Sequence, residues 1–343
     1  MIVAYDARPL RKRHWGVGAV VANVCSRLAS RYSFTGLSPR YPAEEKEDGL
    51  ITWPSLPGLN MAIFEASVLL ARRFDLYWGT NHLVPGLCRG PAVVTVHDLS
   101  LLAYPKGHPA PRYQAWRMAS SIKLARAIVT VSQTTADDLI AVMPELRSRV
   151  EVALNGFDVP RVELNKRREA ESDRPYMVML GAHGLRKNLA LAAVSVFRAA
   201  GGGHLRLLLT GDLHPSYRDI IHQYRDVVEL AGVLPRQELF DLISGAVGLM
   251  YPSQYEGFGL PMLEAMAAGC PVLALDTPIS REIGGNAAWF LAEESACWAT
   301  AIQELMRNRG RRLEMQDLGR ENIKRFSWDR TAEVYAQVFD RSA

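Results

Sequence analysis

Two glutamates stand eight positions apart in a segment rich in glycine and proline, and this segment has the clearest capacity for chemistry. Residues 251–272 read YPSQYEGFGLPMLEAMAAGCPV and contain Glu256 and Glu264. Gly257 and Gly259 allow the backbone to turn sharply and to approach a ligand closely. The pattern predicts a buried strand, a glycine-bearing loop, a short helix with Glu264 on its first turn, and a second strand.

The start of that helix is suited to an anion, because its free backbone N–H groups and the helix dipole favour negative charge. Carboxylates repel phosphate but accept hydrogen bonds from hydroxyl groups. A ligand with a diphosphate flanked by hydroxyl-rich sugars satisfies both properties, and a nucleotide sugar is such a molecule. An alternative stays open, in which Glu256 is a solvated loop charge and Glu264 is simply favoured by the helix dipole.

Two adjacent cations, Arg186 and Lys187, follow the predicted strand 177–180. Fixed cations could stabilise the charge that builds on a departing nucleoside diphosphate. They could equally be surface charges that open a helix.

Three further candidates lie in the first half of the chain. Gly16 and Gly18 follow the first predicted strand and could place backbone N–H groups against a diphosphate, or could form an ordinary turn. His97 ends the predicted strand 92–96, where it could touch a substrate or serve as a structural hydrogen-bonding group.

Short apolar runs alternate with helical patterns along the chain, which predicts parallel sheets covered by helices on both faces. The polar segment 159–175 breaks this alternation and reads as a linker. We therefore expect an N-terminal Rossmann-like domain over residues 1–160, a linker over 161–174, a C-terminal domain over 175–325 and a final helix in 326–343. Two doubly wound sheets would face a cleft at the carboxyl ends of their strands.

The segment 251–272 resembles the signature of glycosyltransferase family four, the retaining group 1 enzymes of GT-B fold. Weaker matches to the family's other motifs follow in order along the chain: Gly16-Val-Gly18, His97-Asp98, Asn155-Gly156, Arg186-Lys187-Asn188, Arg281-Glu282 and Phe326-Ser-Trp328. The resemblance implies two Rossmann-like domains, with the nucleotide-sugar donor on the C-terminal domain and the acceptor on the N-terminal one. The final helix is implied to cross back to the N-terminal domain.

The resemblance also implies roles for single residues. Glu264 matches the glutamate that holds the ribose hydroxyls, Glu256 the one near C3 of the transferred sugar, and His97 the histidine near its C6 hydroxyl. Donor contacts are implied for the backbone amides from Gly257 and Phe258 to Gly259 and Leu260. The family is metal-independent and has no established enzymic nucleophile, so we expect no cofactor, no metal and no covalent intermediate.

The chain departs from the family at one cation. Family members usually carry an arginine and a lysine several residues apart, whereas Arg186 and Lys187 are adjacent here. Arg186-Lys187-Asn188 is similar to a branch that often uses GDP-mannose, which favours mannose as the transferred sugar. Whether Arg186 compensates for the missing spaced arginine stays open.

Composition excludes several other classes. The 343 residues are 48% hydrophobic and 22% charged, as in an ordinary globular protein, and the net charge of +4 gives no reason to expect a nucleic-acid partner. The four cysteines form no CxxC pair, no transmembrane-length apolar run occurs, and the N-terminus does not resemble a signal peptide. These features predict a cytoplasmic protein.

A basic and aromatic stretch between residues 99 and 136 contains no acidic residue. It predicts a peripheral contact with the inner face of the membrane, as expected for an enzyme that extends a sugar or lipid-linked acceptor, and a plain solvated helix face is the alternative. Three other functions stay open: glycosylation of a small natural product, a non-catalytic subunit that binds nucleotide sugars, and a nucleotide-sugar epimerase.

Overall fold

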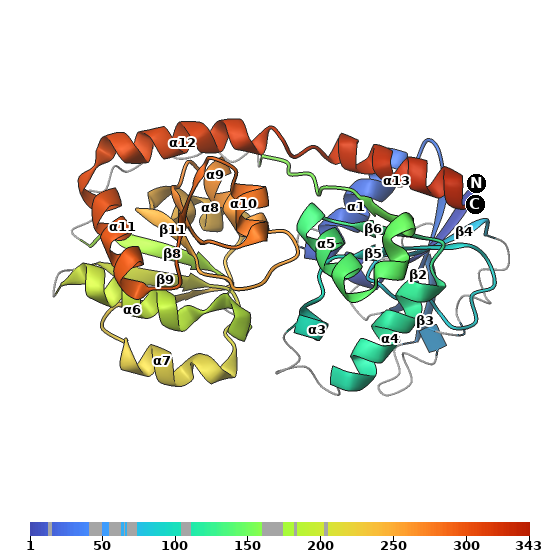
Figure 1. The fold of residues 1–343 in the computed structure, drawn as a ribbon, viewed down its shortest axis with the longest axis horizontal. Helices are drawn as coiled ribbons and strands as arrows, with labels where there is room; N and C mark the ends of the chain where they lie inside the picture. Colours follow the sequence, from blue (N-terminus) through green and yellow to red (C-terminus); the bar gives the residue numbers. More distant parts are fainter. Residues whose placement is uncertain are drawn as a thin grey trace. The chain divides into compact units, whose positions relative to one another are not determined.

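The structure, a computed structural model, divides the chain into two compact units. It describes residues 1–12, 16–40, 50–54, 63–64, 66, 74–103, 111–159, 174–181, 184–201 and 205–343. Unit 1 comprises Met1–Gly156 and Phe326–Ala343, and unit 2 comprises Phe157–Arg325 (Figure 1). The predicted linker, residues 161–174, lies outside the described residues except for Arg174, so its assignment stays a prediction.

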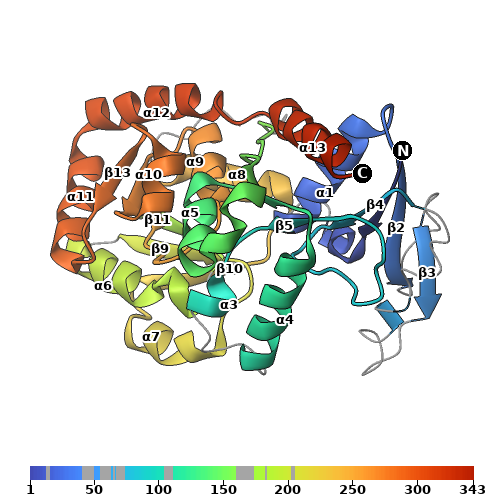
Figure 2. The ribbon, with the colours of Figure 1, turned by 45° about the vertical axis from the view of Figure 1, so that its right-hand side comes forward.

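Unit 1 is built on a parallel seven-stranded sheet in the order β3-β2-β1-β4-β5-β6-β7. β4 and β5 are buried along their whole length, as expected for short apolar runs in a sheet covered on both faces. The strands are β1 (Ile2–Asp6), β2 (Ser33–Arg40), β3 (Leu50–Pro54), β4 (Leu76–Gly79), β5 (Ala92–Val96), β6 (Ala127–Thr130) and β7 (Val150–Val152). Figure 2 shows β3 at the edge of this sheet, beyond β2.

The helices of unit 1 include the last one of the chain. Those whose bounds lie within the described residues are η1 (Arg8–Lys12), α1 (Gly16–Leu28), α3 (Ser100–Ala103), α4 (Pro111–Leu124), α5 (Gln133–Val142), η2 (Pro144–Arg149) and α13 (Trp328–Ser342). Both chain termini therefore lie in unit 1, next to one another (Figures 1 and 2).

Aromatic residues attach α13 to the core of unit 1. The ring of Trp78 on β4 lies 5.2 Å from the ring of Tyr335 and 5.6 Å from that of Phe339. The hydroxyl of Thr95 accepts a hydrogen bond from Trp78 Nε1 at 2.9 Å and lies 2.8 Å from the Tyr335 hydroxyl. The polar atoms of these buried side chains are thereby paired, which removes the cost of burying them.

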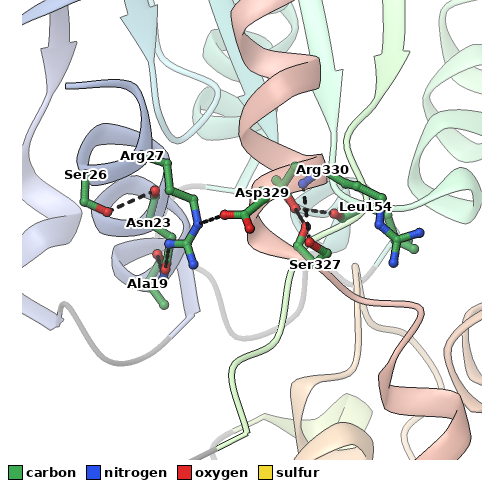
Figure 3. Close-up of polar contacts among 9 residues, drawn as sticks. Ala19, Asn23, Ser26, Arg27, Leu154, Ser327, Asp329 and Arg330 are labelled. Atoms are coloured by element: carbon green, nitrogen blue, oxygen red, sulfur yellow. Dashed lines mark hydrogen bonds and ion pairs between the residues drawn. The ribbon is translucent and has the colours of Figure 1, made fainter. Parts of the chain in front are cut away.

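Polar contacts hold the start of α13 against α1 and against the chain after β7 (Figure 3). Arg27 on α1 donates to Asp329 at 2.7 Å, and the Thr331 hydroxyl donates to the carbonyl of Leu154 at 2.7 Å. A Cβ atom at Gly156 would lie 2.2 Å from the backbone nitrogen of Trp328. Only glycine allows the two segments to pass this closely.

Unit 2 is built on a parallel six-stranded sheet in the order β10-β9-β8-β11-β12-β13. This is the doubly wound order in which the direction of winding reverses between the first and fourth strands, here β8 and β11. The strands are β8 (Tyr176–Leu180), β9 (Arg206–Thr210), β10 (Val228–Gly232), β11 (Gly248–Tyr251), β12 (Val272–Leu275) and β13 (Ala288–Leu291).

Helices cover both faces of the second sheet. Figure 1 shows α6 and α7 on one side and α8, α9 and α10 on the other. The helical segments are η3 (Leu185–Lys187), α6 (Leu189–Ala200), η4 (Pro215–Tyr217), α7 (Arg218–Gln223), α8 (Arg236–Gly245), α9 (Leu260–Ala267), α10 (Pro278–Gly284), α11 (Ser295–Arg307) and α12 (Arg309–Ile323). α11 packs beside α6, and α12 packs on α9.

The predicted fold class is confirmed: each unit is a Rossmann-like α/β domain with a parallel, doubly wound sheet. None of the helices within the described ranges combines the length and the apolar character that a membrane span requires.

Candidate functional site

The crevice at a switch point of a doubly wound sheet is where such folds bind ligands, and the predicted donor residues of unit 2 gather there. Arg186 and Lys187 lie in the loop after β8, and Glu256 lies in the loop after β11. The two loops are joined directly. The backbone N–H of Gln254 donates to the carbonyl of Arg186 at 2.8 Å, and Arg186 Nε donates to the carbonyl of Tyr255 at 3.1 Å.

An ion pair at the centre of this crevice brings three predicted residues together. Lys187 Nζ lies 2.7 Å from Glu256 Oε1, and an Arg186 guanidinium nitrogen lies 3.7 Å from Glu256 Oε2. The side chains of Lys187 and Glu256 are only 7% and 13% exposed. The alternative of a plain surface charge is therefore wrong for Lys187. A lysine held in a nearly dry site interacts strongly with any further anion that arrives.

The local sequence explains why Lys187 points inward. Leu185–Lys187 forms a single 3-10 turn, and Asn188 then adopts the left-handed conformation, with φ of 52°. Asparagine tolerates this conformation better than most residues. The Asn188 side chain accepts a hydrogen bond from the N–H of Leu191 at 3.4 Å and so begins α6. The Tyr217 hydroxyl, which comes from another segment, donates to the carbonyl of Gly184 at 2.9 Å and holds the start of the turn in place.

The glycine loop after β11 has the predicted form. Gly259 has φ of 117°, and a Cβ there would lie 3.2 Å from the Tyr251 hydroxyl. Gly257 and Phe258 are buried, and α9 begins at Leu260. Gly259 provides no side chain to cap the helix. Pro261 has no N–H, and the N–H of Met262 donates to the carbonyl of Gly259 at 3.0 Å. The N–H of Leu260 and the positive end of the helix dipole are therefore what the start of α9 can offer to an anion.

The position of Glu264 differs from the prediction by one turn. Because α9 begins at Leu260, Glu264 lies at the start of the second turn rather than on the first. Its carboxyl is buried, and desolvation raises its pKa to about 7, while the charges of Arg236 and Lys187 act in the opposite direction. With this pKa, the carboxyl is only about half ionised at pH 7. Hydroxyl groups that donate hydrogen bonds to it would favour its charged form.

Arg236, the first residue of α8, was missed by the sequence prediction although its charge acts on Glu264. The signal was present, since Arg236 directly follows Pro235 at the end of the loop after β10. Tyr251 was also given no role. The Lys187 ammonium lies 5.8 Å from the centre of its ring, and burial raises the pKa of its hydroxyl well above the usual value.

The remaining predicted residues lie in unit 1. His97 follows β5, and its Nε2 is 2.8 Å from the carbonyl of Thr80; desolvation lowers the pKa of its imidazole. Asp98 anchors the following turn by accepting from the N–H of Ser100 at 2.8 Å. Gly16 begins α1 with φ of 51°, and Gly18 is buried in the first turn of that helix.

A second histidine of unit 1 escaped sequence prediction. His82 follows β4 and adopts φ of 50°, and its N–H donates to the carbonyl of Thr95 at 2.9 Å. Desolvation, with a contribution from the charge of His97, lowers its pKa to about 4. No pattern in the sequence marks a residue for this backbone conformation, because histidine adopts it only occasionally.

A metal site was not predicted from the sequence. Over the parts of the chain that the structure describes, no group of three or more His, Cys, Asp or Glu side chains is arranged to hold an ion. Metal independence itself stays a prediction.

Solved structures with the same fold include enzymes that act on sugars. A sucrose-phosphate synthase from Thermosynechococcus elongatus superimposes with a TM-score of 0.76 at 17% identity, covering 99% of this chain and 98% of that one. WaaG, a glycosyltransferase involved in lipopolysaccharide biosynthesis, gives 0.76 at 14% identity, over 98% and 99%. HepE of Anabaena, in complex with UDP and glucose, gives 0.75 at 16% identity, over 99% of both chains. These likenesses establish the fold, that of GT-B glycosyltransferases.

Similar sequences include two bacterial mannosyltransferases. The O-antigen chain mannosyltransferase RfbU of Salmonella typhimurium is 27% identical over 231 residues, which cover 66% of this chain and 63% of that protein. The match thus spans less than two thirds of the relative's length. O-antigen chain mannosyltransferase B of Escherichia coli is 28% identical over 280 residues, 74% of this chain and 71% of that protein.

Two family models match adjoining parts of the chain. The model for Glycosyltransferase Family 4 matches residues 16–161, in unit 1 and the segment that follows it. The model for Glycosyl transferases group 1 matches residues 174–308, which contain the ion pair, the glycine loop and Glu264. The chain therefore belongs to glycosyltransferase family 4, the group 1 glycosyl transferases.

Proposed function

We propose that the protein is a retaining, metal-independent glycosyltransferase that moves mannose from GDP-mannose to an acceptor hydroxyl during assembly of a cell-envelope polysaccharide or glycolipid. The buried Lys187–Glu256 ion pair carries the proposal, because it fixes a cation in the loop after β8 and a carboxylate in the loop that leads to the start of α9. The two mannosyltransferase relatives favour mannose. UDP-glucose is the main competitor, since HepE is described in complex with it.

The roles follow from the chemistry of each group. Lys187 and Arg186 would balance the charge on the departing diphosphate, with Glu256 near C3 of the sugar and Glu264 holding the ribose hydroxyls. The N–H groups from Gly257 to Leu260 would bind phosphate and sugar oxygens. In unit 1, Gly16 and Gly18 would offer N–H groups to the diphosphate and His97 would contact the C6 hydroxyl. With no enzymic nucleophile assigned, the leaving phosphate would accept the proton of the incoming hydroxyl.

A transfer reaction with defined compounds tests the proposal. GDP-mannose, UDP-glucose, dTDP-glucose and ADP-glucose are each incubated with octyl α-mannoside in the presence of a chelator, and the product is followed by NMR. We expect transfer from GDP-mannose, with the anomeric proton of the product in the α configuration of the donor. Lys187→Met should abolish transfer, because methionine keeps the volume but removes the cation. Lys324→Met, at an exposed lysine directly after α12, should leave transfer unchanged.

Each other outcome has a distinct meaning. Transfer from UDP-glucose alone would identify UDP-glucose as the donor in place of GDP-mannose. Inversion of the anomeric centre would refute the retaining mechanism. Dependence on a divalent ion would refute metal independence. Binding of a nucleotide sugar with no transfer and no release of nucleoside diphosphate would favour the non-catalytic subunit. Epimerised donor without any acceptor product would favour an epimerase.

α4 supports the proposed peripheral contact with a membrane. Tyr113, Trp116 and Leu124 on this helix are 58%, 64% and 64% exposed, and the two aromatic rings lie 6.1 Å apart. Arg117 and Lys123 lie on the same helix, and residues 99–136 contain no acidic side chain. Exposed aromatic groups beside cations favour an anionic lipid surface.

Sedimentation with vesicles tests this contact. The protein should bind vesicles that contain phosphatidylglycerol more strongly than vesicles of phosphatidylcholine alone. Trp116→Ala should reduce the binding, whereas Phe197→Ala, at a 53% exposed aromatic residue of unit 2, should not. Equal binding of the two variants would refute the assignment of the contact to α4.

A further inference from the structure

Glu293 follows β13 and lies outside every motif of the sequence, yet its carboxylate joins two loops of the candidate site. Its Oε1 atom accepts a hydrogen bond from Asn188 Nδ2 at 2.7 Å and another from Gln254 Nε2 at 2.5 Å. One oxygen of a third loop therefore bridges the side chains of the other two. A carboxylate oxygen has the lone pairs to accept both bonds at once.

The two bridged residues adjoin the central ion pair. Asn188 directly follows Lys187, and Gln254 lies two positions before Glu256. The loops are already tied by the backbone bond from Gln254 to Arg186, at 2.8 Å. The Glu293 bridge adds a side-chain link between the same two loops.

The conformation of Asn188 makes this bridge specific. Its Oδ1 atom accepts from the N–H of Leu191, so its Nδ2 group is left to donate elsewhere. Its left-handed backbone, with φ of 52°, sets the direction in which the chain enters α6 from Lys187. A bond that holds the Asn188 amide therefore also restrains the backbone next to Lys187.

We propose that Glu293 is a positioning residue of the donor site, which holds the loops after β8 and β11 in the register that pairs Lys187 with Glu256. The inference rests on the proposed function, in which this site binds a nucleotide sugar. Glu293 acts through hydrogen bonds to two neutral amides, so its role requires an acceptor oxygen and does not require its negative charge.

Calorimetric titration with GDP and with UDP tests the inference on the full chain. Glu293→Ala removes the bridge and should weaken binding of the preferred nucleotide about fivefold to tenfold, the loss of two exposed hydrogen bonds. Glu293→Gln keeps a carbonyl oxygen that can accept both bonds, and its affinity should stay within about twofold of the unaltered protein. Glu294→Ala removes a carboxylate at the next position and should leave the nucleotide affinity unchanged. The described hydrogen bonds of Glu294 lie within its own turn and α11.

The opposite results are equally clear. Unchanged affinity in Glu293→Ala, or a loss in Glu293→Gln as large as that in Glu293→Ala, would overturn the inference. A loss of similar size in Glu294→Ala would show that the charge of the segment matters rather than the bridge. If the unaltered protein bound neither nucleotide, the proposed function itself would fail, and a positioning role toward a donor would fail with it.

A melting-temperature cycle measures the bridge without any ligand. Glu293→Ala and Gln254→Ala remove the two ends of one hydrogen bond. The double variant should therefore lose less melting temperature than the two single variants lose together. Full additivity would mean that the two side chains do not interact in solution.

Discussion

The two sheets share their strand order around the switch point, but the loops on either side of that point are joined in different ways. In unit 2, the charged groups Lys187 and Glu256 connect the loop after β8 with the loop after β11. In unit 1, the corresponding loops follow β1 and β4, and an uncharged contact joins them: the Thr80 hydroxyl donates to the carbonyl of Asp6 at 2.7 Å.

At the corresponding place in unit 1, the ion pair lies within one short segment of the chain. Arg8 and Asp6 pair within two positions of one another, with Arg8 Nε 2.8 Å from Asp6 Oδ1. The loops after β4 and β5 carry the imidazoles of His82 and His97, whose pKa values burial lowers, and the side chain of Asp98, which accepts from the N–H of Ser100. The comparison teaches that one strand order can support two kinds of crevice. Unit 2 holds a buried cation that is paired across two loops, whereas unit 1 holds two buried imidazoles and an arginine that is paired within its own segment.

The largest expected effect comes from breaking the ion pair of unit 2. Glu256→Ala removes the ion-pair partner of the nearly buried Lys187 and leaves Arg186 beside it, which should lower the free energy of unfolding by about 3 to 4 kcal/mol. Urea denaturation monitored by tryptophan fluorescence measures the loss. Glu321→Ala, which removes an exposed partner of Lys324, should cost less than about 1 kcal/mol. Equal losses would mean that the Lys187 pair is solvated.

The second prediction concerns the buried carboxyl of unit 2. The pKa of Glu264 rises from 4.5 to about 7, so the folded protein keeps a proton that the unfolded chain releases, and stability falls as pH rises between these values. Above pH 7 the cost is about 3 kcal/mol. Glu264→Gln removes this cost. The melting temperature of the variant relative to the unaltered protein should therefore rise from pH 5 to pH 8, and a constant difference would contradict the buried ionisation.

Unit 1 should respond to pH in the opposite direction. The pKa of His82 falls from 6.5 to about 4, in surroundings that include His97, Asp98, Asp6 and Arg8. Between pH 6.5 and pH 4, the imidazole is protonated in the unfolded chain but stays unprotonated in the folded protein. The free energy of unfolding therefore falls as pH falls, by about 2 kcal/mol at pH 5. His82→Asn tolerates the left-handed backbone and cannot be protonated. The variant should lose less melting temperature than the unaltered protein between pH 7.5 and pH 5; an equal loss would contradict the prediction.

The smallest expected difference is the one between alanine substitutions at two glycines with positive φ. Gly259→Ala places a Cβ 3.2 Å from the Tyr251 hydroxyl at φ of 117°, and should cost about 2 to 3 kcal/mol. Gly16→Ala has φ of 51° and no atom within 4 Å of the new Cβ, and should cost about 1 kcal/mol. Thermal melting of both variants measures the difference. Equal costs would show that the crowding around Tyr251 does not constrain the loop.

The sequence predicts much of this molecule, because its strongest signals are local. The strand, glycine loop and helix over residues 251–272 lie within one short segment, so residue types alone indicate their conformation. Alternating apolar runs predict the parallel sheets for the same reason. The turn that holds Glu264 was misplaced because the exact start of a helix depends on its terminal backbone geometry.

Contacts between distant positions could not be predicted in this way. Lys187 and Glu256 lie in loops that follow different strands, and their pairing depends on β8 and β11 lying side by side in the sheet. Glu293 reaches the same loops from a third strand, β13, and no motif marks it. Such residues become visible only once the order of the strands is known.

Binding of a nucleoside diphosphate to matched variants of the two units tests the central claim most directly. Calorimetry with GDP and UDP would compare the unaltered protein with Lys187→Met, in unit 2, and Arg8→Met, in unit 1, at low and moderate salt. The account predicts that Lys187→Met loses binding by at least about tenfold and reduces its salt dependence, whereas Arg8→Met binds as the unaltered protein does. Equal binding by Lys187→Met, or a loss confined to Arg8→Met, would contradict the assignment of the diphosphate to the switch point of unit 2.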